Sequence, residues 1–111
     1  MSTPRVKSSL SVSIALRRGD MMGKPGMVLR KGDPDAGGIL LVLRGREGCS
    51  VVSRVTGSDG EPTWMRATGE GPVDQEAADA YVERRVKSDP DLWVLEFETG
   101  DLAVPFDAKT L

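Results

Sequence analysis

Apolar residues alternate with polar ones near the start of the chain, at Leu10, Val12, Ile14 and Leu16. A period of two is typical of a half-buried β-strand, so we predict a strand over this segment. The residues that follow, "RRGDMMG", favour a short helix near residues 15–22 that stops at the next glycine and proline. A single helix over residues 9–22 is the alternative interpretation.

The same kind of pattern predicts four strands in the middle of the chain, separated by short segments rich in turn-forming residues. They cover residues 27–31, 39–45, 49–55 and 63–68. The run from Ile39 to Leu43 is entirely apolar, which is typical of a strand covered on both faces. We therefore expect a mainly antiparallel meander in which "GDPDAGG", residues 32–38, is a hairpin connection.

Helical periodicity replaces the alternation in the second half of the chain. Asp74 can cap the N-terminus of a long helix over residues ~75–88. Asp89 and Pro90 end this helix, because the residue before a proline avoids the helical conformation. The apolar stripe of the helix consists of Ala78, Tyr81, Val82 and Val86.

Two further strands are predicted after this helix, over residues 92–98 and 102–106. The second is assigned to an edge of the sheet, where Pro105 is tolerated. The predicted fold class is α+β: a mainly antiparallel sheet of about six strands with one long helix packed on it. A short helix near residues 15–22 is the second helical element.

The chain has 111 residues, so we assign residues 1–111 to a single domain with frayed ends at residues 1–6 and 108–111. Apolar residues make up 39% of the chain and charged residues 29%, a balance typical of a folded globular protein. No apolar run approaches the roughly 20 residues of a membrane span, and no signal peptide is evident. Cys49 is the single cysteine and cannot form an internal disulfide, so we expect a cytoplasmic protein.

The chain contains no histidine. Histidine is the commonest general acid or base near neutral pH and the commonest metal ligand. A zinc site is therefore not expected, and a Ser-His or Cys-His pair within the chain is excluded. Enzymatic chemistry would depend on carboxylates that hold Mg²⁺ or Mn²⁺. We favour a protein without enzymatic activity, cofactor or resident metal.

The triplet Asp-Pro-Asp occurs twice, at residues 33–35 and 89–91. Two carboxylates two residues apart can reach one hard cation, and four brought together would suit a two-metal site. The second triplet is explained as the end of a helix before a strand, so Asp89 and Asp91 are weaker candidates. The main candidate site is the first triplet with the two basic residues before it: Asp33, Asp35, Arg30 and Lys31.

Charge is distributed unevenly along the chain, whose net charge is −2. Residues 1–54 carry ten basic and four acidic residues, and residues 55–111 carry five basic and thirteen acidic ones. This asymmetry can mark a phosphate-binding surface, but two halves that face each other in the fold would also complement one another. With few aromatic residues, we do not expect nucleic-acid binding. The weaker candidates for a phosphate site are two arginine pairs: Arg17, Arg18, Arg84 and Arg85.

Several segments taken together resemble a known family. They are "VSIALRR", "VLRKGDPDAGGILLVL", "TWMRATG" and "ADAYVERRVKSDPDLWVLEFE", in this order between about residues 6 and 102. The combination is similar to a small uncharacterised bacterial family, the domain of unknown function numbered 1491. The resemblance implies a compact cytoplasmic protein of about this length, and it brings no known activity, cofactor or catalytic residue. Family members have alanine-rich helical sequence where this chain has "GDMMG", which favours the short helix near residues 15–22.

Three hypotheses of function follow. The first is a small non-enzymatic binding or protein-interaction module, with self-association through an edge strand as one form and with no membrane partner. The second is a carboxylate and metal enzyme built on Asp33, Asp35, Asp89 and Asp91. The third is a phosphate or nucleic-acid binder that uses Arg17, Arg18, Arg30, Lys31, Arg84 and Arg85.

Overall fold

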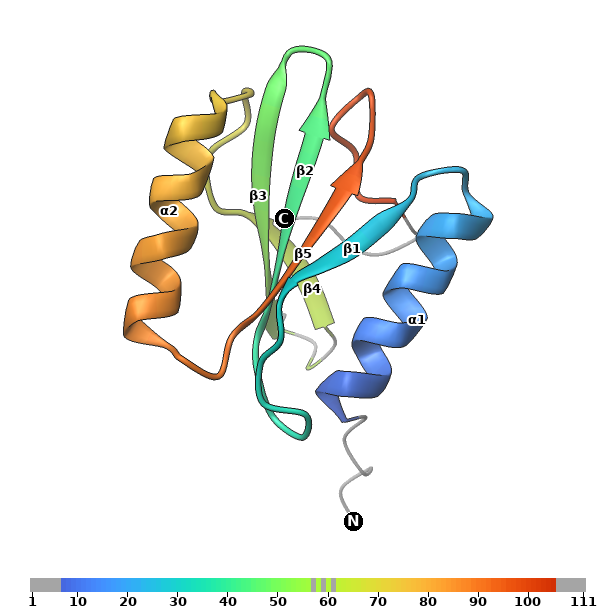
Figure 1. Ribbon diagram of the computed structural model, residues 1–111, viewed down its shortest axis with the longest axis vertical. Coiled ribbons are helices and arrows are strands. Elements are labelled where there is room, and N and C mark those ends of the chain that lie inside the picture. The colour runs from blue at the N-terminus through green and yellow to red at the C-terminus, as the bar shows by residue number, and fades with distance from the viewer. Residues whose placement is uncertain (1–6, 57, 59, 61, 106–111) are drawn as a thin grey trace.

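The computed structural model describes residues 7–56, 58, 60 and 62–105 and shows one sheet with a helix on either side (Figure 1). The predicted α+β class is confirmed. The ends predicted to be frayed lie outside the described residues. Along the chain the elements are α1 (Ser8–Met21), β1 (Gly26–Arg30), β2 (Ile39–Gly45), β3 (Gly48–Thr56), β4 (Pro62–Arg66), α2 (Gln75–Ser88) and β5 (Trp93–Glu98).

The five strands form a mixed sheet in the order β1-β5-β2-β3-β4. β5 pairs antiparallel with β1 and parallel with β2, and the remaining neighbours are antiparallel. The predicted meander is confirmed for β2, β3 and β4. The predicted hairpin at residues 32–38 is wrong, because β5 lies between β1 and β2 (Figure 1). This segment therefore connects two strands that are not neighbours in the sheet.

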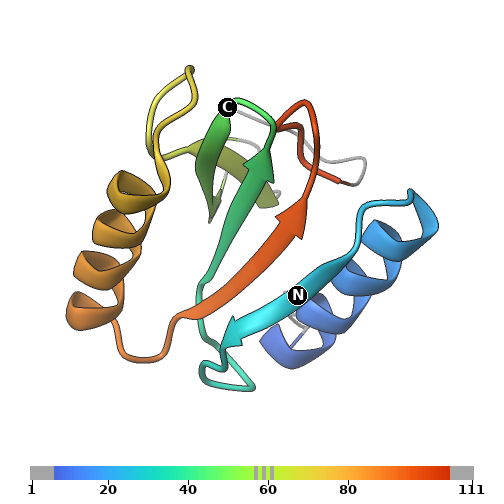
Figure 2. The ribbon, with the colours of Figure 1, turned by 45° about the horizontal axis from the view of Figure 1, so that its top comes forward.

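One helix lies on each side of the sheet (Figure 2). Each face of the sheet carries its own apolar core under one of these helices. Alternate side chains of β2 point to opposite faces, and both faces are covered along Ile39–Leu43, which is why these five residues are all apolar. Val12 and Ala15 of α1 complete the core that contains Leu41. Ala78 of α2 completes the core that contains Leu40. The expectation that β2 is covered on both faces is therefore confirmed.

The strand predicted from the alternation at residues 10–16 is wrong, because these residues belong to α1. The alternative, one helix over residues 9–22, is close to the observed bounds. Leu10 and Ile14 are 54% and 41% exposed, so part of the alternation comes from side chains that face solvent. The buried residues of α1 follow a helical spacing and are Ser8, Val12, Ala15 and Gly19.

The edge strand predicted at residues 102–106 is not formed by residues 102–105, and residue 106 lies outside the described part of the chain. Leu102 has a φ of 57°, in the left-handed region, which interrupts an extended backbone. Its N–H donates to the carbonyl of Thr99 at 3.0 Å and closes a turn directly after β5. Leu102 and Val104 still pack against the α1-side core. The sheet therefore has five strands rather than six.

The long helix predicted in the second half is confirmed as α2. The Asp74 side chain accepts the N–H of Ala77 at 2.8 Å and caps its first turn. The predicted apolar stripe packs against the second core, and Ala78 is fully buried. Among the described residues, neither helix has the length and apolarity needed to cross a membrane.

Candidate functional site

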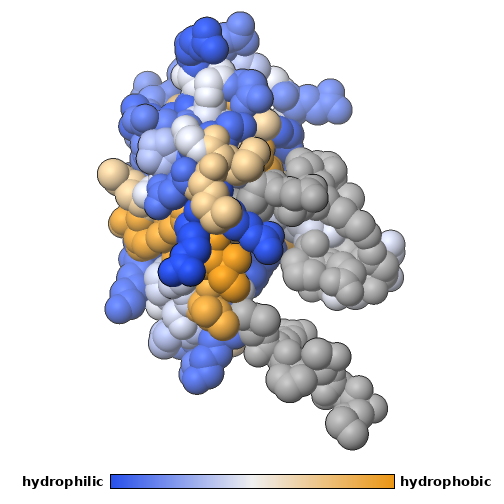
Figure 3. Space-filling view, turned by 90° about the vertical axis from the view of Figure 1, so that its right-hand side faces the viewer, coloured by the Kyte–Doolittle hydropathy of each residue, from blue (hydrophilic) through white to orange (hydrophobic). Residues whose placement is uncertain are grey.

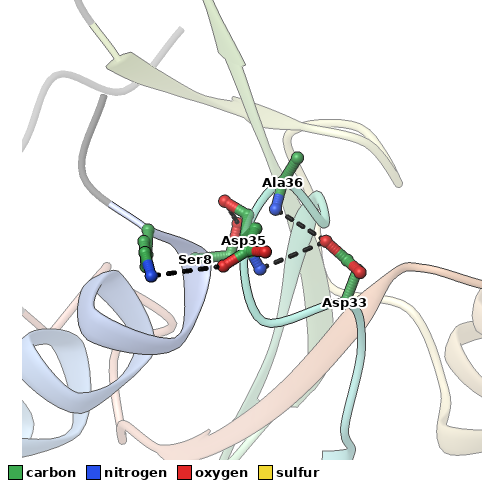
Figure 4. A network of polar contacts seen from close by, with 5 residues as sticks. Ser8, Asp33, Asp35 and Ala36 are labelled. Atoms are coloured by element: carbon green, nitrogen blue, oxygen red, sulfur yellow. Dashed lines mark hydrogen bonds and ion pairs between the residues drawn. The ribbon is translucent and has the colours of Figure 1, made fainter. Parts of the chain in front are cut away.

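The first Asp-Pro-Asp triplet closes the N-terminal end of α1 (Figure 4). The carbonyl oxygens of Pro34 and Asp35 accept the backbone N–H groups of Ser9 and Ser8, at 2.9 and 3.2 Å. The Ser8 hydroxyl donates to the carbonyl of Gly37 at 2.7 Å. The first N–H groups of a helix have no acceptor within the helix, and this loop supplies carbonyl acceptors for two of them.

The two carboxylates of this triplet have different surroundings (Figure 4). The Asp33 carboxylate accepts the N–H groups of Asp35 and Ala36, at 3.1 and 2.8 Å, and so stabilises its own turn. The Asp35 carboxylate lies 3.7 Å from Nζ of Lys7, and these side chains are 69% and 73% exposed. An ion pair this exposed contributes little to stability. Asp35 is therefore the member of the triplet whose carboxylate faces solvent.

The two triplets lie against each other, and their backbones make the contact. The N–H of Asp33 donates to the carbonyl of Asp91 at 2.9 Å, and Nε1 of Trp93 donates to the carbonyl of Asp33 at 2.7 Å. Gly32 and Gly37 permit this approach, because a Cβ at either position would overlap the Asp91 carbonyl oxygen. The fold thus brings the two triplets together at the start of β5.

Other side chains at this junction also form hydrogen bonds with the backbone of the loops. The Asp89 carboxylate accepts the N–H of Asp91 at 3.2 Å. The Arg30 guanidinium donates to the carbonyl of Pro90 at 2.9 Å, and its Nε is buried without a hydrogen-bond partner in the described structure. Within the described ranges, no group of three or more His, Cys, Asp or Glu side chains is placed to hold a metal ion. The junction therefore joins the loop after β1 to the end of α2.

The basic candidates lie on two layers of the molecule. The Arg17–Arg18 pair is exposed on α1, and Lys31 is exposed directly after β1. Arg84 and Arg85 belong to α2, on the opposite face of the sheet, where each guanidinium lies 5.8 Å from the centre of the Tyr81 ring. The six basic residues proposed for a phosphate site therefore do not form one surface.

Cys49 and Arg54 are perturbed by burial. Cys49 lies in the α2-side core, and burial raises the pKa of its thiol. A thiol with a raised pKa stays protonated at neutral pH, so Cys49 acts as a packing residue. Burial lowers the pKa of the Arg54 guanidinium on β3.

An apolar surface along α1 and β1 was missed by the sequence analysis. Eight large apolar side chains of the described residues are exposed, by 40–78%, and all but Met65 lie on this side. Figure 3 faces this side and shows hydrophobic side chains gathered there, with hydrophilic ones between them. The signal in the sequence was the alternation at residues 10–16, whose apolar residues exceed what one buried helix stripe holds. We call this set the α1/β1 surface: Leu10, Ile14, Met21, Met22, Met27, Val28 and Leu29.

Both faces of β1 contribute to this surface. Successive side chains of a strand point to opposite faces of the sheet. Met27, Val28 and Leu29 are consecutive, and all three are exposed. In β2 the corresponding central side chains are all buried. β1 is thus an edge strand with exposed side chains on both of its faces.

These features define a class of small α+β domain, in which two helices enclose a mixed five-stranded sheet and the first helix and its edge strand expose apolar side chains. Residues 6–107 match the family model described as "Protein of unknown function (DUF1491)", and the chain belongs to this family. The resemblance predicted from the sequence is confirmed. No curated protein matches the chain.

Solved structures of related proteins have the same fold. A crystal structure of a DUF1491 family protein from Caulobacter crescentus CB15 is 32% identical, with a TM-score of 0.83 over 96% of this chain and 100% of that one. An NMR structure of a DUF1491 family protein from the same organism is 30% identical, with a TM-score of 0.82 over 98% and 99%. The solution structure of protein Atu0922 from A. tumefaciens is 26% identical, with a TM-score of 0.80 over 97% and 98%. These matches support the strand order and the two-helix arrangement described above.

Proposed function

We propose that the protein is a small non-enzymatic interaction module that binds another polypeptide through the α1/β1 surface. The observation that carries this proposal is the exposure of seven large apolar side chains on one side of the molecule. Monomeric proteins rarely expose contiguous apolar patches larger than a few hundred Å², and larger patches mark sites of interaction. Self-association through β1 is one form of the proposal.

The composition of the surface supports a protein partner. Met21, Met22 and Met27 are three of its seven members. Methionine is flexible and polarisable, and it is common on surfaces that adapt to a partner. The exposed Arg17 and Arg18 lie on α1, and arginine is enriched in protein interfaces.

The two other hypotheses have less support from the geometry. The carboxylates of Asp33 and Asp89 accept backbone N–H groups in their own turns. The basic residues are divided between α1 with β1 and α2. We propose a cytoplasmic location, with which a single, free cysteine agrees.

Site-specific photo-crosslinking in the native cell tests the proposal. A photoreactive amino acid replaces Leu10 or Met27, both of which are exposed on the α1/β1 surface. Glu83, exposed on α2, is the matched control position. We expect a defined protein adduct from the first two positions and none from the third. Adducts from all three positions alike, or from none, contradict the proposal.

A further inference from the structure

β1 presents an open hydrogen-bonding edge within the α1/β1 surface. The carbonyl of Pro25 accepts an N–H from β5 at 3.2 Å, and Met27 is paired with β5 in the same register. In an antiparallel ladder, residues whose backbone groups bind the neighbouring strand alternate with residues whose groups point away. Gly26 and Val28 therefore direct their N–H and C=O groups outward. Within the described residues, no backbone hydrogen bond outside the ladder reaches either of them.

The open edge is short, and residues 26–29 within it carry no charge. The register shifts between Val28 and Arg30, which is a bulge that ends regular pairing. Natural edge strands are usually short, or are blunted by a bulge, by charged side chains, by proline or by a covering element, and β1 has the first two of these features. Residues 26–29 carry no charged side chain, and Met27 and Val28 are exposed. An added strand thus has room to pair over about three residues.

Positive charge without an ion-pair partner in the described part of the chain lies on α1 and directly after β1. Arg17, Arg18 and Lys31 are exposed, and Asp20 is the one acidic residue of α1. The ion pairs formed among the described residues include none of these three basic side chains. They join Lys7 to Asp35, Lys24 to Asp101 and Arg44 to Glu96. A partner with acidic side chains would complement the surface.

We infer that the α1/β1 surface binds an extended polypeptide segment in which acidic residues flank large apolar ones, and that this segment adds a short strand beside Gly26–Val28. The inference rests on the proposed function and specifies its partner. Side chains of the added strand alternate between the two faces of the sheet. Those on one face contact the exposed side of α1, and those on the other face lie beside Met27. The acidic ends approach Arg17 and Arg18 on α1 and Lys31 after β1.

Two other occupants satisfy the surface less completely. A second copy paired symmetrically through β1 places both α1 helices on the same face of the joined sheet and offers no acidic partner to the exposed Arg17 and Arg18 of either helix. An anionic lipid surface complements these arginines but leaves the backbone groups of Gly26 and Val28 without partners. An acidic extended segment satisfies the apolar, charged and backbone features together.

A displayed library of random linear peptides, selected on the full chain, tests the inference. We expect the selected peptides to be enriched in Asp and Glu around an apolar centre. Synthetic peptides with these sequences are expected to bind more weakly as the salt concentration rises, because screening reduces the attraction of Arg17 and Arg18.

Three variants locate the binding site. Val28→Pro removes an outward N–H while replacing one exposed apolar side chain with another, and it is expected to weaken peptide binding about tenfold. Arg17→Glu with Arg18→Glu reverses the charge of α1 and is expected to weaken binding about tenfold or more. Arg84→Glu with Lys87→Glu makes the same charge change on α2 and is expected to alter binding by less than about twofold.

The outcomes separate this inference from the proposed function. Peptides without acidic enrichment, or binding unchanged by Val28→Pro, overturn the inference, while cross-links from Leu10 or Met27 positions still support an interaction module. If the protein binds phosphatidylserine vesicles and Val28→Pro does not change this binding, the surface is assigned to a membrane instead. A dimer that Val28→Pro disrupts assigns it to a second copy. No selected peptide together with no cross-link overturns both.

Discussion

Asp33 and Asp35 lie two residues apart in one loop, but only the Asp33 side chain stabilises the conformation of the loop. Its carboxylate accepts two backbone N–H groups, whereas Asp35 makes an exposed ion pair with Lys7. The sequence indicates that the second triplet ends a helix, whereas the first was assigned to a candidate site. The reason is that the loop caps a helix beginning at Ser8, and the alternation of apolar residues had assigned a strand to that segment.

Replacing the two aspartates separately measures this difference. Asp33→Ala is expected to lower the free energy of unfolding by about 1 kcal/mol, because two N–H groups lose their acceptor. Asp35→Ala, the matched control, is expected to cost less than about 0.5 kcal/mol. Urea denaturation followed by circular dichroism gives both values. Equal losses in the two variants would show that Asp33 is not the side chain that supports the loop.

Because the Cys49 thiol is buried, we expect it to react slowly with thiol reagents and to make the free energy of unfolding depend on pH. Because burial raises its pKa, the thiol of the folded protein carries less reactive thiolate at neutral pH than a free thiol does. We expect a thiol-reactive dye to label the native protein slowly and the urea-unfolded protein fully, with Cys49→Ala as the blank. Rapid complete labelling of the native protein at neutral pH contradicts this.

The same raised pKa links Cys49 to stability. The folded state holds the thiol proton more tightly than the unfolded state does. Its contribution is therefore fully present below the ordinary thiol pKa, and it is lost as the pH rises through the raised value. The free energy of unfolding of the wild-type chain should fall with alkaline pH relative to that of Cys49→Ala. Parallel pH profiles for the two chains would be the opposite result.

At the scale of elements, the helix α1 shows why a correct pattern led to a wrong strand. Val12 is buried and Leu10 and Ile14 are exposed, although all three are apolar and equally spaced. Periodicity assumes that apolar residues serve the core. On α1 some of them form the α1/β1 surface instead, so the residues that misled the prediction are the ones assigned to binding. α2 was predicted correctly because Asp74 caps it and its apolar stripe is buried.

Proline scanning of β1 tests which backbone groups are paired. Met27→Pro removes an N–H that faces β5 and is expected to cost about 1–3 kcal/mol, because the acceptor on β5 is left unpaired. Val28→Pro removes an outward N–H and is expected to cost less than about 1 kcal/mol. Both side chains are exposed, so the comparison isolates the backbone. Thermal denaturation measures the two costs, and the reverse order would refute the assigned register.

For the whole molecule, the seating of α1 on the sheet depends on two glycines that meet one aromatic ring. A Cβ at Gly19 would lie 2.6 Å from Cε1 of Phe97, and a Cβ at Gly26 would overlap the same ring. Phe97 is fully buried at the centre of the α1-side core. α1, β1 and β5 therefore approach one another closely at the Phe97 ring. This close approach determines where the α1/β1 surface lies.

Gly26→Ala tests this close approach. The added methyl forces Phe97 or α1 to shift, and we expect a loss of about 1–3 kcal/mol in the free energy of unfolding. Gly71→Ala is the control, because no heavy atom lies within 4 Å of the Cβ that it adds. Chemical denaturation of both variants gives the comparison. A Gly26→Ala protein as stable as the control would mean that the helix is seated more loosely than described.

The sequence was sufficient for the fold class and for five strand positions, but not for the strand order. Local pattern indicates where a strand forms, because it depends on neighbouring residues. Strand order depends on pairing between distant segments, and a short connection at residues 32–38 favoured a hairpin. Nothing near those residues indicates that residues 93–98 enter between the two strands they connect.

The position of β5 also determines when the sheet can be completed during synthesis on the ribosome. β1 and β2 are synthesised well before β5, the strand that separates them. Arg44 of β2 can pair with Glu96 only after another 52 residues have been added. Until then the apolar residues 39–43 of β2 lack the β5 neighbour on one edge, and exposed apolar strands of this kind are bound by chaperones. Completion of the native sheet therefore includes a long-range closing step, which cannot occur before β5 has been synthesised. A chain released before Trp93 would leave β1 without any sheet to join.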